Sequence, residues 1–247
     1  MTRRIAISSG HGLHIRGARG SPVPPQLDEV DQARRVVDRV ASKLGCPKFH
    51  DNVSDDQSEN LNRIVNWHNS QSRDLDVSVH FNAYDHTAHG TEVLYVTQKT
   101  ISQQVAQAIV NAGGFTLRGD QGAVYRNNLA FLNNTTGPAI LIETCFCDHT
   151  GDSNAFNAEF EAICVAIAES ISGQDLEAPV EPPIEATGEN GVDITATTDD
   201  HVSVICNEAL IIGHEGCEHT VKLTIATKGD VVVVINGEEF HDYPPVR

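Results

Sequence analysis

Ala139-Ile-Leu-Ile142 is the stretch of sequence that decides the fold. Its four apolar residues follow one another without the polar alternation of a half-exposed strand, so they predict a strand that is buried on both faces. Strands of this kind lie in sheets that are covered by helices on both sides. The stretch therefore predicts a central strand of a layered α/β domain.

The segments around this stretch alternate between strand and helix patterns. Short apolar runs predict strands, whereas apolar residues at spacings of three and four predict helices. The expected strands are 5–7, 76–80 and 92–96, and the expected helices are 28–44, one capped by Ser58, 101–112 and 153–171. Alternation of this kind predicts a three-layer α/β domain with a mixed, mostly parallel sheet flanked by helices.

A second, smaller domain is expected after a linker. Residues 174–185 are rich in proline and acidic residues, which predicts an extended, solvated segment. Beyond it, short β-rich runs separated by turn signals predict a small antiparallel β domain. The expected organisation is an α/β domain at 1–173, a linker at 174–185 and a β-rich domain at 186–247.

The composition argues against several classes of partner. The 247-residue chain has a formal net charge of −17, which disfavours nucleic acid and anionic membranes. No window approaches the roughly 18 apolar residues of a membrane helix, and the N-terminus lacks the apolar core and cleavage site of a secretory signal. We expect no nucleic-acid partner, no membrane partner and no signal peptide. Whether Cys206 and Cys217 are bonded stays open.

Histidine and glutamate residues follow the ends of the expected strands. His11 lies just past the first strand, His80 ends the second and Glu143 follows Ile142 directly. Because the carboxyl ends of parallel strands share one edge of a sheet, these side chains are expected to meet there. Glu29, at the start of the first helix, is a fourth candidate at the same edge, although Asp28 and Asp31 compete with it.

Two imidazoles and one carboxylate are a common ligand set of catalytic zinc. A further carboxylate beside such a site can act as general base on a water that the metal activates. On these residues alone the indication is weak, since the chain contains twelve histidines.

Five segments, in this order, resemble the amidase-3 family of zinc-dependent N-acetylmuramoyl-L-alanine amidases. They are Ile5-Ala-Ile-Ser-Ser-Gly-His-Gly12, Leu27-Asp-Glu-Val-Asp-Gln-Ala33, Ser78-Val-His-Phe-Asn-Ala83, Gly90-Thr-Glu-Val-Leu-Tyr95 and Pro138-Ala-Ile-Leu-Ile-Glu-Thr-Cys-Phe146. The resemblance covers about residues 3–172. The chain departs from the family's pattern at Ser8-Ser9, where Asp-Pro is usual, at Asp148-His149, where Ser-Asn is frequent, and near Lys48-Phe-His50, which lacks the usual Thr-Arg.

The resemblance implies that one Zn²⁺ per chain is bound by His11, Glu29 and His80, and that Glu143 is the catalytic carboxylate. The implied activity is hydrolysis of the amide between N-acetylmuramic acid and L-alanine in peptidoglycan, with a zinc-activated water and Glu143 as general base. Two alternatives stay open: a zinc peptidase that acts on the stem peptide, and a catalytically inactive wall-binding protein.

The domain at 186–247 has two interpretations. It is expected either to bind a cell-wall polymer, which raises the enzyme's effective concentration on its substrate, or to mediate oligomerisation. The missing signal peptide, the lytic domain that the resemblance implies and the second domain together suggest a phage endolysin that is made in the cytoplasm and acts on the cell wall after release. A bacterial enzyme that is not encoded by a phage is the alternative.

Overall fold

The computed structural model describes residues 2–20 and 27–176, together with four strand segments after residue 190. The chain divides into two compact units, Met1–Glu177 and Ala178–Arg247. None of the described helices combines the length and the apolar character that a bilayer span requires.

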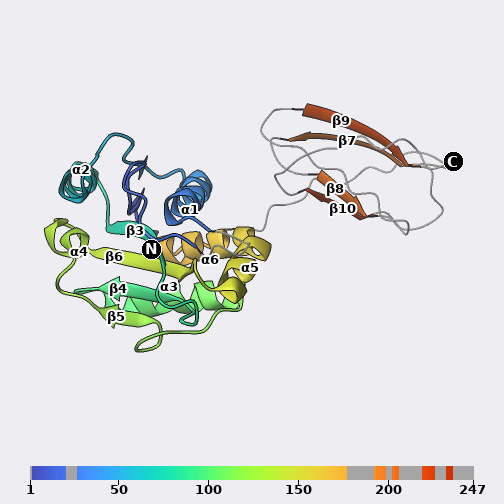
Figure 1. Cartoon of the computed structure of the whole chain (residues 1–247). Coiled ribbons are helices and arrows are strands. Elements are labelled where there is room, and N and C mark those ends of the chain that lie inside the picture. The colour runs from blue at the N-terminus through green and yellow to red at the C-terminus, as the bar shows by residue number, and fades with distance from the viewer. Residues whose placement is uncertain are drawn as a thin grey trace. The chain divides into compact units, whose positions relative to one another are not determined.

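A six-stranded sheet forms the centre of the first unit (Figure 1). Its strands are β1 (Ile5–Ser9), β2 (Lys48–Phe49), β3 (Leu75–Asn82), β4 (Glu92–Tyr95), β5 (Ala123–Tyr125) and β6 (Ala139–Phe146), in the order β2-β1-β3-β6-β4-β5. Strands β2, β1, β3 and β6 pair in parallel, whereas β4 pairs antiparallel with β6 and parallel with β5. The predicted three-layer domain with a mixed, mostly parallel sheet is confirmed.

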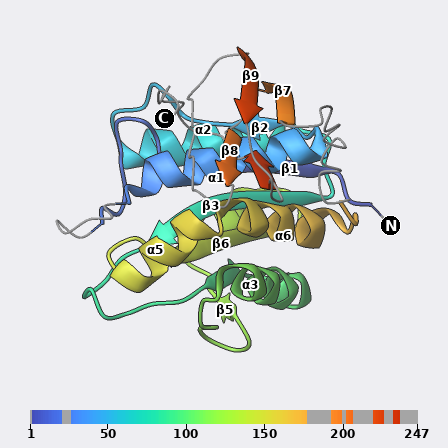
Figure 2. The same ribbon diagram turned by 90° about the vertical axis from the view of Figure 1, so that its right-hand side faces the viewer.

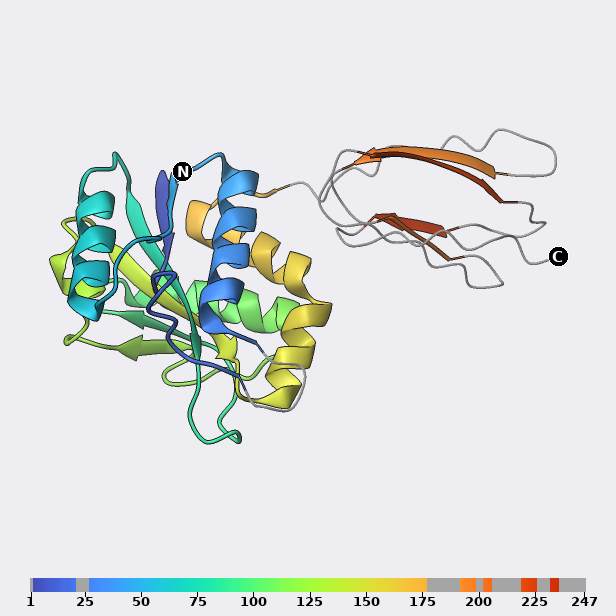
Figure 3. The ribbon, with the colours of Figure 1, turned by 45° about the horizontal axis from the view of Figure 1, so that its top comes forward.

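Helices cover both faces of this sheet. They are α1 (Glu29–Leu44), α2 (Gln57–Asn69), α3 (Lys99–Gly113), α4 (Ala130–Asn134), α5 (Thr150–Ala158) and α6 (Phe160–Ser172). Helices α1, α6 and α3 follow one another across one face, with α1 beside α6 and α6 beside α3 (Figures 2 and 3). Helices α2 and α4 pack together on the other face. The larger apolar cluster lies under α1, α3 and α6, and a smaller one lies under α2 and α4.

The first helix carries clear signals at both ends. Asp28 has an extended backbone and accepts a hydrogen bond from the Val30 N–H, so it is the N-cap. Gly45 ends the helix in the left-handed conformation, with φ of 60°. Between these caps the apolar side chains at helical spacing are buried, as the sequence predicts, except that Leu44 in the last turn is only half-buried.

Two of the predicted helices differ in detail. Helix α2 is capped by Asp56, whose carboxylate accepts from the Glu59 N–H, and not by Ser58. The helix expected at 153–171 is two helices, because the backbone leaves the helical conformation at Glu159. Phe156 packs edge-on against Phe81 below β3, whereas Phe160 lies under the guanidinium of Arg35.

Ser8, near the end of β1, takes part in a buried polar network on the α2 face. His68 lies between its hydroxyl, at 2.9 Å from Nε2, and Asp76, at 2.8 Å from Nδ1. Because a carboxylate only accepts, Nδ1 carries the proton and Nε2 accepts from Ser8. Burial lowers the pKa of His68, which keeps the ring neutral. Arg73 adds two hydrogen bonds to Asp76 and balances its charge.

Ser9 makes the matching set of contacts on the opposite face. Its hydroxyl lies 2.9 Å from His50 Nδ1, and His50 Nε2 lies 3.0 Å from Asp38. Serine, histidine and aspartate in this order also occur in serine hydrolases, but Ser8 and Ser9 have no exposed surface and cannot meet a substrate. The two sets therefore fix the end of β1. They also explain two departures from the family pattern, since Ser8-Ser9 and His50 are bonding partners.

The second unit is described only through its strands. These are β7 (Val192–Thr198), β8 (Val202–Ile205), β9 (His219–Ile225) and β10 (Val232–Ile235). β7 pairs antiparallel with β9, and β8 pairs antiparallel with β10. Cys206, Cys217 and residues 209–212, which form one of the β-rich runs of the sequence, lie outside the described residues. Within the first unit, Cys46, Cys145, Cys147 and Cys164 are free thiols.

Replacing the buried Asp76 by asparagine is expected to destabilise the first unit by about 3 kcal/mol, because Arg73 loses its charge partner in a buried position. Trp67 is the single tryptophan of the chain and its ring contacts that of His68, so its fluorescence during urea unfolding reports on this unit.

Asp74→Asn is the matched control, because the Asp74–Arg4 pair is exposed and its loss should change the unfolding midpoint little. Equal midpoints for Asp76→Asn and Asp74→Asn would show that the buried network does not stabilise the fold.

Candidate metal centre and active site

The register of the sheet brings the predicted site residues to one edge. His80 in β3 lies directly opposite Glu143 in β6. β1 runs parallel to β3 with Ser9 opposite Val79, so the chain beyond β1 places His11 at the same edge. The sheet thus gathers two imidazoles and one carboxylate at its carboxyl end, as the sequence predicts.

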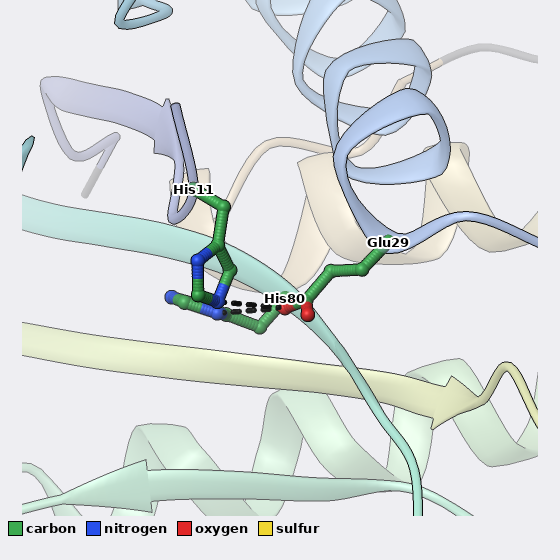
Figure 4. A group of neighbouring side chains, drawn as sticks. All are labelled: His11, Glu29 and His80. Atoms are coloured by element: carbon green, nitrogen blue, oxygen red, sulfur yellow. Dashed lines mark hydrogen bonds and ion pairs between the residues drawn. The ribbon is translucent and has the colours of Figure 1, made fainter. Parts of the chain in front are cut away.

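The first helix brings Glu29 into this group (Figure 4). Glu29 Oε1 lies 2.9 Å from His80 Nδ1 and 3.5 Å from His11 Nε2. The two imidazole rings meet edge to face with centroids 5.0 Å apart. One donor atom from each of the three residues lies within 4.8 Å of the others, which makes them a group able to hold a metal ion.

Backbone N–H groups hold the Glu29 carboxylate in place. The Ala18 N–H donates to Oε2 at 2.6 Å and the Phe81 N–H donates to Oε1 at 3.2 Å. The side chain is almost completely buried, so these contacts fix its orientation without help from solvent. The neighbouring acids Asp28 and Asp31 are not part of the group, because Asp28 caps the helix and both form ion pairs with Arg16.

Two glycines allow the backbone to pack directly against the ligand group. A Cβ atom on Gly10 would lie 1.7 Å from His80 Nε2, and one on Gly17 would lie 2.3 Å from Glu29 Oε2. Gly17 also has φ of 66°, in the left-handed region that other residues rarely adopt. These close approaches leave room for the His80 and Glu29 side chains but for nothing larger than glycine.

The charge states suit a cation. Burial tends to raise the pKa of Glu29, but the hydrogen bond from His80, the two imidazoles and the Ala18 N–H together hold that pKa below its ordinary value. Burial and the neighbouring His80 lower the pKa of His11. Burial tends to lower the pKa of His80, but the Glu29 carboxylate outweighs this effect and raises it, so a metal ion bound there would replace a proton on that ring. The donor set of His11, Glu29 and His80 therefore fits zinc.

Glu143 lies beside this group without being part of it. Burial raises the pKa of Glu143 to about 8; the His80 charge opposes the shift, while the carboxylates of Glu29 and Glu92 add to it. Its Oε2 is buried and has no hydrogen-bond partner among the described residues. A carboxyl group with a pKa near neutrality is suited to accept a proton and return it.

Glu92 is a neighbour of the site that the sequence does not reveal. It lies directly opposite Glu143 in the β4–β6 ladder, and its carboxylate accepts from Asn82 Nδ2 and Arg118 Nε, each at 3.2 Å. The guanidinium of Arg118 in turn lies 4.7 Å from the centre of the Phe146 ring. The motif Gly90–Tyr95 marks Glu92 as part of a strand, but only the antiparallel pairing places it next to Glu143.

Two buried carboxylates accept hydrogen bonds from the backbone of the segment that follows β3. Asp148 Oδ2 accepts from the N–H groups of Tyr84 and His86, and Asp152 Oδ2 accepts from the Gly90 N–H. His149 caps helix α5 by accepting from the Asp152 N–H. Asp148-His149, which departs from the family's usual Ser-Asn, therefore anchors the loop next to His80.

Comparison with known proteins matches residues 5–173 to the family model described as N-acetylmuramoyl-L-alanine amidase. An uncharacterized protein of Clostridium perfringens is 28% identical over 72% of this chain, and the N-acetylmuramoyl-L-alanine amidase LytC of Bacillus subtilis is 27% identical over 61%. The alignments span 54% and 30% of those two proteins, so this chain matches only about half or less of each curated relative.

A solved structure gives the same result for the fold. The catalytic domain of an endolysin that targets Clostridia difficile superimposes with a TM-score of 0.56 and 25% identity, over 68% of this chain and 96% of that domain. The family match covers the whole α/β unit, including His11, Glu29, His80 and Glu143. This chain therefore belongs to the amidase-3 family of N-acetylmuramoyl-L-alanine amidases.

Proposed function

We propose that this protein hydrolyses the amide bond between N-acetylmuramic acid and L-alanine in peptidoglycan, as a zinc-dependent enzyme. The observation that carries the proposal is the clustering of His11, Glu29 and His80 beside Glu143, inside the segment that matches the amidase family. A catalytically inactive wall-binding protein would not require this arrangement of three ligands and a buried carboxyl group.

The three ligands have separate tasks in the proposed site. Glu29 supplies a negative charge that its backbone hydrogen bonds hold in position, and His11 and His80 supply nitrogen donors from two other parts of the chain. A zinc ion bound there would supply positive charge that makes a water molecule more acidic and polarises the scissile carbonyl group.

Glu143 is the proposed proton carrier. It accepts a proton from the attacking water and then gives it to the nitrogen of L-alanine as the amide bond breaks, so that the enzyme ends the cycle unchanged. Burial raises the pKa of Glu143 to about 8, which suits the transfer of a proton to the leaving nitrogen near neutral pH. A cation bound beside Glu143 would favour the ionised carboxylate that the first step requires. The products are a free lactyl carboxylate and a free amino group.

Two further proposals concern the second unit and the biological role of the protein. We propose that residues 186–247 hold the enzyme on a cell-wall polymer, and that the protein acts as an endolysin. The likeness to an endolysin catalytic domain supports the second proposal. Oligomerisation is the alternative role of the second unit.

The purified protein is expected to contain one zinc ion per chain, measured by elemental mass spectrometry. His80→Ala should lose the metal and the activity, because it removes one of three donors. His14→Ala, at an exposed histidine close to His11, is the control and should keep both. Native protein without zinc, or zinc retained in His80→Ala, would contradict the ligand assignment.

Glu143→Gln is expected to keep the fold and the zinc but to lower the rate of wall digestion by at least about 100-fold, since glutamine cannot carry the proton. Mass spectrometry of the products of the unchanged enzyme tests the bond that is cut. New N-terminal L-alanine supports the amidase, whereas other new amino groups would favour a peptidase acting on the stem peptide. Normal digestion by Glu143→Gln would show that another group is the base.

The role of the second unit can be tested in the Glu143→Gln background, where the wall is not degraded. The full-length variant is expected to sediment with purified cell walls, and the same variant ending at Glu177 should remain largely in the supernatant. Equal sedimentation would exclude wall binding by residues 178–247. A change of molar mass in light scattering upon truncation would favour oligomerisation.

A further inference from the structure

The three ligands of the candidate metal centre are not supported equally. His80 belongs to β3, which pairs with β1 on one side and β6 on the other, and Glu29 accepts two backbone hydrogen bonds at the start of α1. His11 lies beyond the end of β1, where residues 10–18 form neither helix nor strand (Figure 4). The position of its imidazole therefore depends on the contacts that other parts of the chain make with this segment.

Asn60, the fourth residue of α2, contacts the glycines on both sides of His11. Its Nδ2 donates to the Gly10 carbonyl at 3.2 Å, and a Cβ atom on Gly12 would lie 2.8 Å from its Oδ1. The asparagine and both glycines are buried, whereas His11 is partly exposed. The amide of Asn60 thus holds the turn from its buried side and leaves the imidazole facing the other two ligands.

The continuation of this turn is held through Asp51, which is completely buried. The Leu13 N–H donates to the Asp51 carbonyl at 2.8 Å, and the Asp51 carboxylate accepts from Arg63 Nε at 3.1 Å. Arg63 lies in α2, three residues after Asn60. The same helix therefore supports the His11 segment at two points, and neither point involves the side chain of a ligand.

The Oδ1 atom of Asn60 indicates that this residue does more than stabilise the fold. The atom is buried and has no hydrogen-bond partner among the described residues. A buried acceptor without a partner costs free energy of folding. Leucine would fill a similar space without this cost, but it could not donate a hydrogen bond to Gly10. The bond to the Gly10 carbonyl is therefore the contact that distinguishes asparagine from an apolar residue at this position.

We propose that Asn60 is the positioning residue of His11, because it holds the turn of Gly10 to Gly12 in the conformation in which the imidazole can bind the metal ion. The inference rests on the proposed zinc site and adds to it a residue outside the ligand set. Positioning of this kind raises the affinity for the metal, since the ligand loses less conformational freedom on binding.

Zinc titration of the full chain, in competition with a chromogenic chelator, tests the inference. Asn60→Leu removes the donor to Gly10 and keeps the size of the side chain, so the variant should bind Zn²⁺ about 10-fold more weakly than the unchanged protein. Asn60→Ala is the second variant, because alanine is smaller and suits a helix, and it should show the same loss even if leucine does not fit.

Cobalt(II) in place of zinc gives a second readout, because its visible absorption depends on the arrangement of its ligands. The spectra of the cobalt-loaded Asn60→Leu and Asn60→Ala proteins should differ from the spectrum of the unchanged protein, as His11 is no longer held in place. A loss of stability alone would lower the amount of folded protein without changing the shape of the spectrum.

Asn69→Ala is the matched control. Asn69 ends the same helix, and its Nδ2 also donates to a backbone carbonyl, that of Asn134, at 3.0 Å. This variant should keep the zinc affinity and the cobalt spectrum, and a loss equal to that of Asn60→Leu would overturn the inference.

Unchanged affinity and spectrum in both Asn60 variants would overturn it as well, while zinc binding by the unchanged protein would leave the proposed function standing. Failure of the unchanged protein to bind zinc would reject the proposed function and this inference together.

Discussion

The candidate site depends on one constraint, the matched parallel register of β1, β3 and β6. This register places His80 opposite Glu143 and brings the end of β1 level with Val79, so that His11 follows at the same edge. A shift of a single residue would turn His80 toward the other face of the sheet. The buried apolar side chains of the three strands hold the register, because they fit between helices on both sides.

Much of this fold can be predicted from the sequence because its central segments have strong patterns. Ile5–Ser9, Leu75–Asn82 and Ala139–Phe146 are buried strands, and α1 has apolar spacing and caps that identify it without further information. The strands β2 and β5 and helix α4 contain two to five residues each, too few for a period to be visible. The direction of β4 also escapes prediction, since alternation reveals a strand but not the way it runs.

The site could be predicted only in part, for a related reason. Each of His11, His80 and Glu143 follows a strand, and strand order brings them together, but the choice of Glu29 over Asp28 and Asp31 came from the family resemblance. The structure supplies the reason, because Asp28 and Asp31 pair with Arg16 while Glu29 turns inward. The contacts of Ser8 with His68 and of Ser9 with His50 could not be predicted from the sequence, because they join residues far apart in the chain.

Gly10 and Gly17 show how a position without any chemistry can be as restricted as a ligand. Both lie where the backbone touches His80 or Glu29, and even one added methyl group would occupy the space of those side chains. In a saturation mutagenesis screen for lysis, the two glycines would tolerate as few replacements as the ligands themselves.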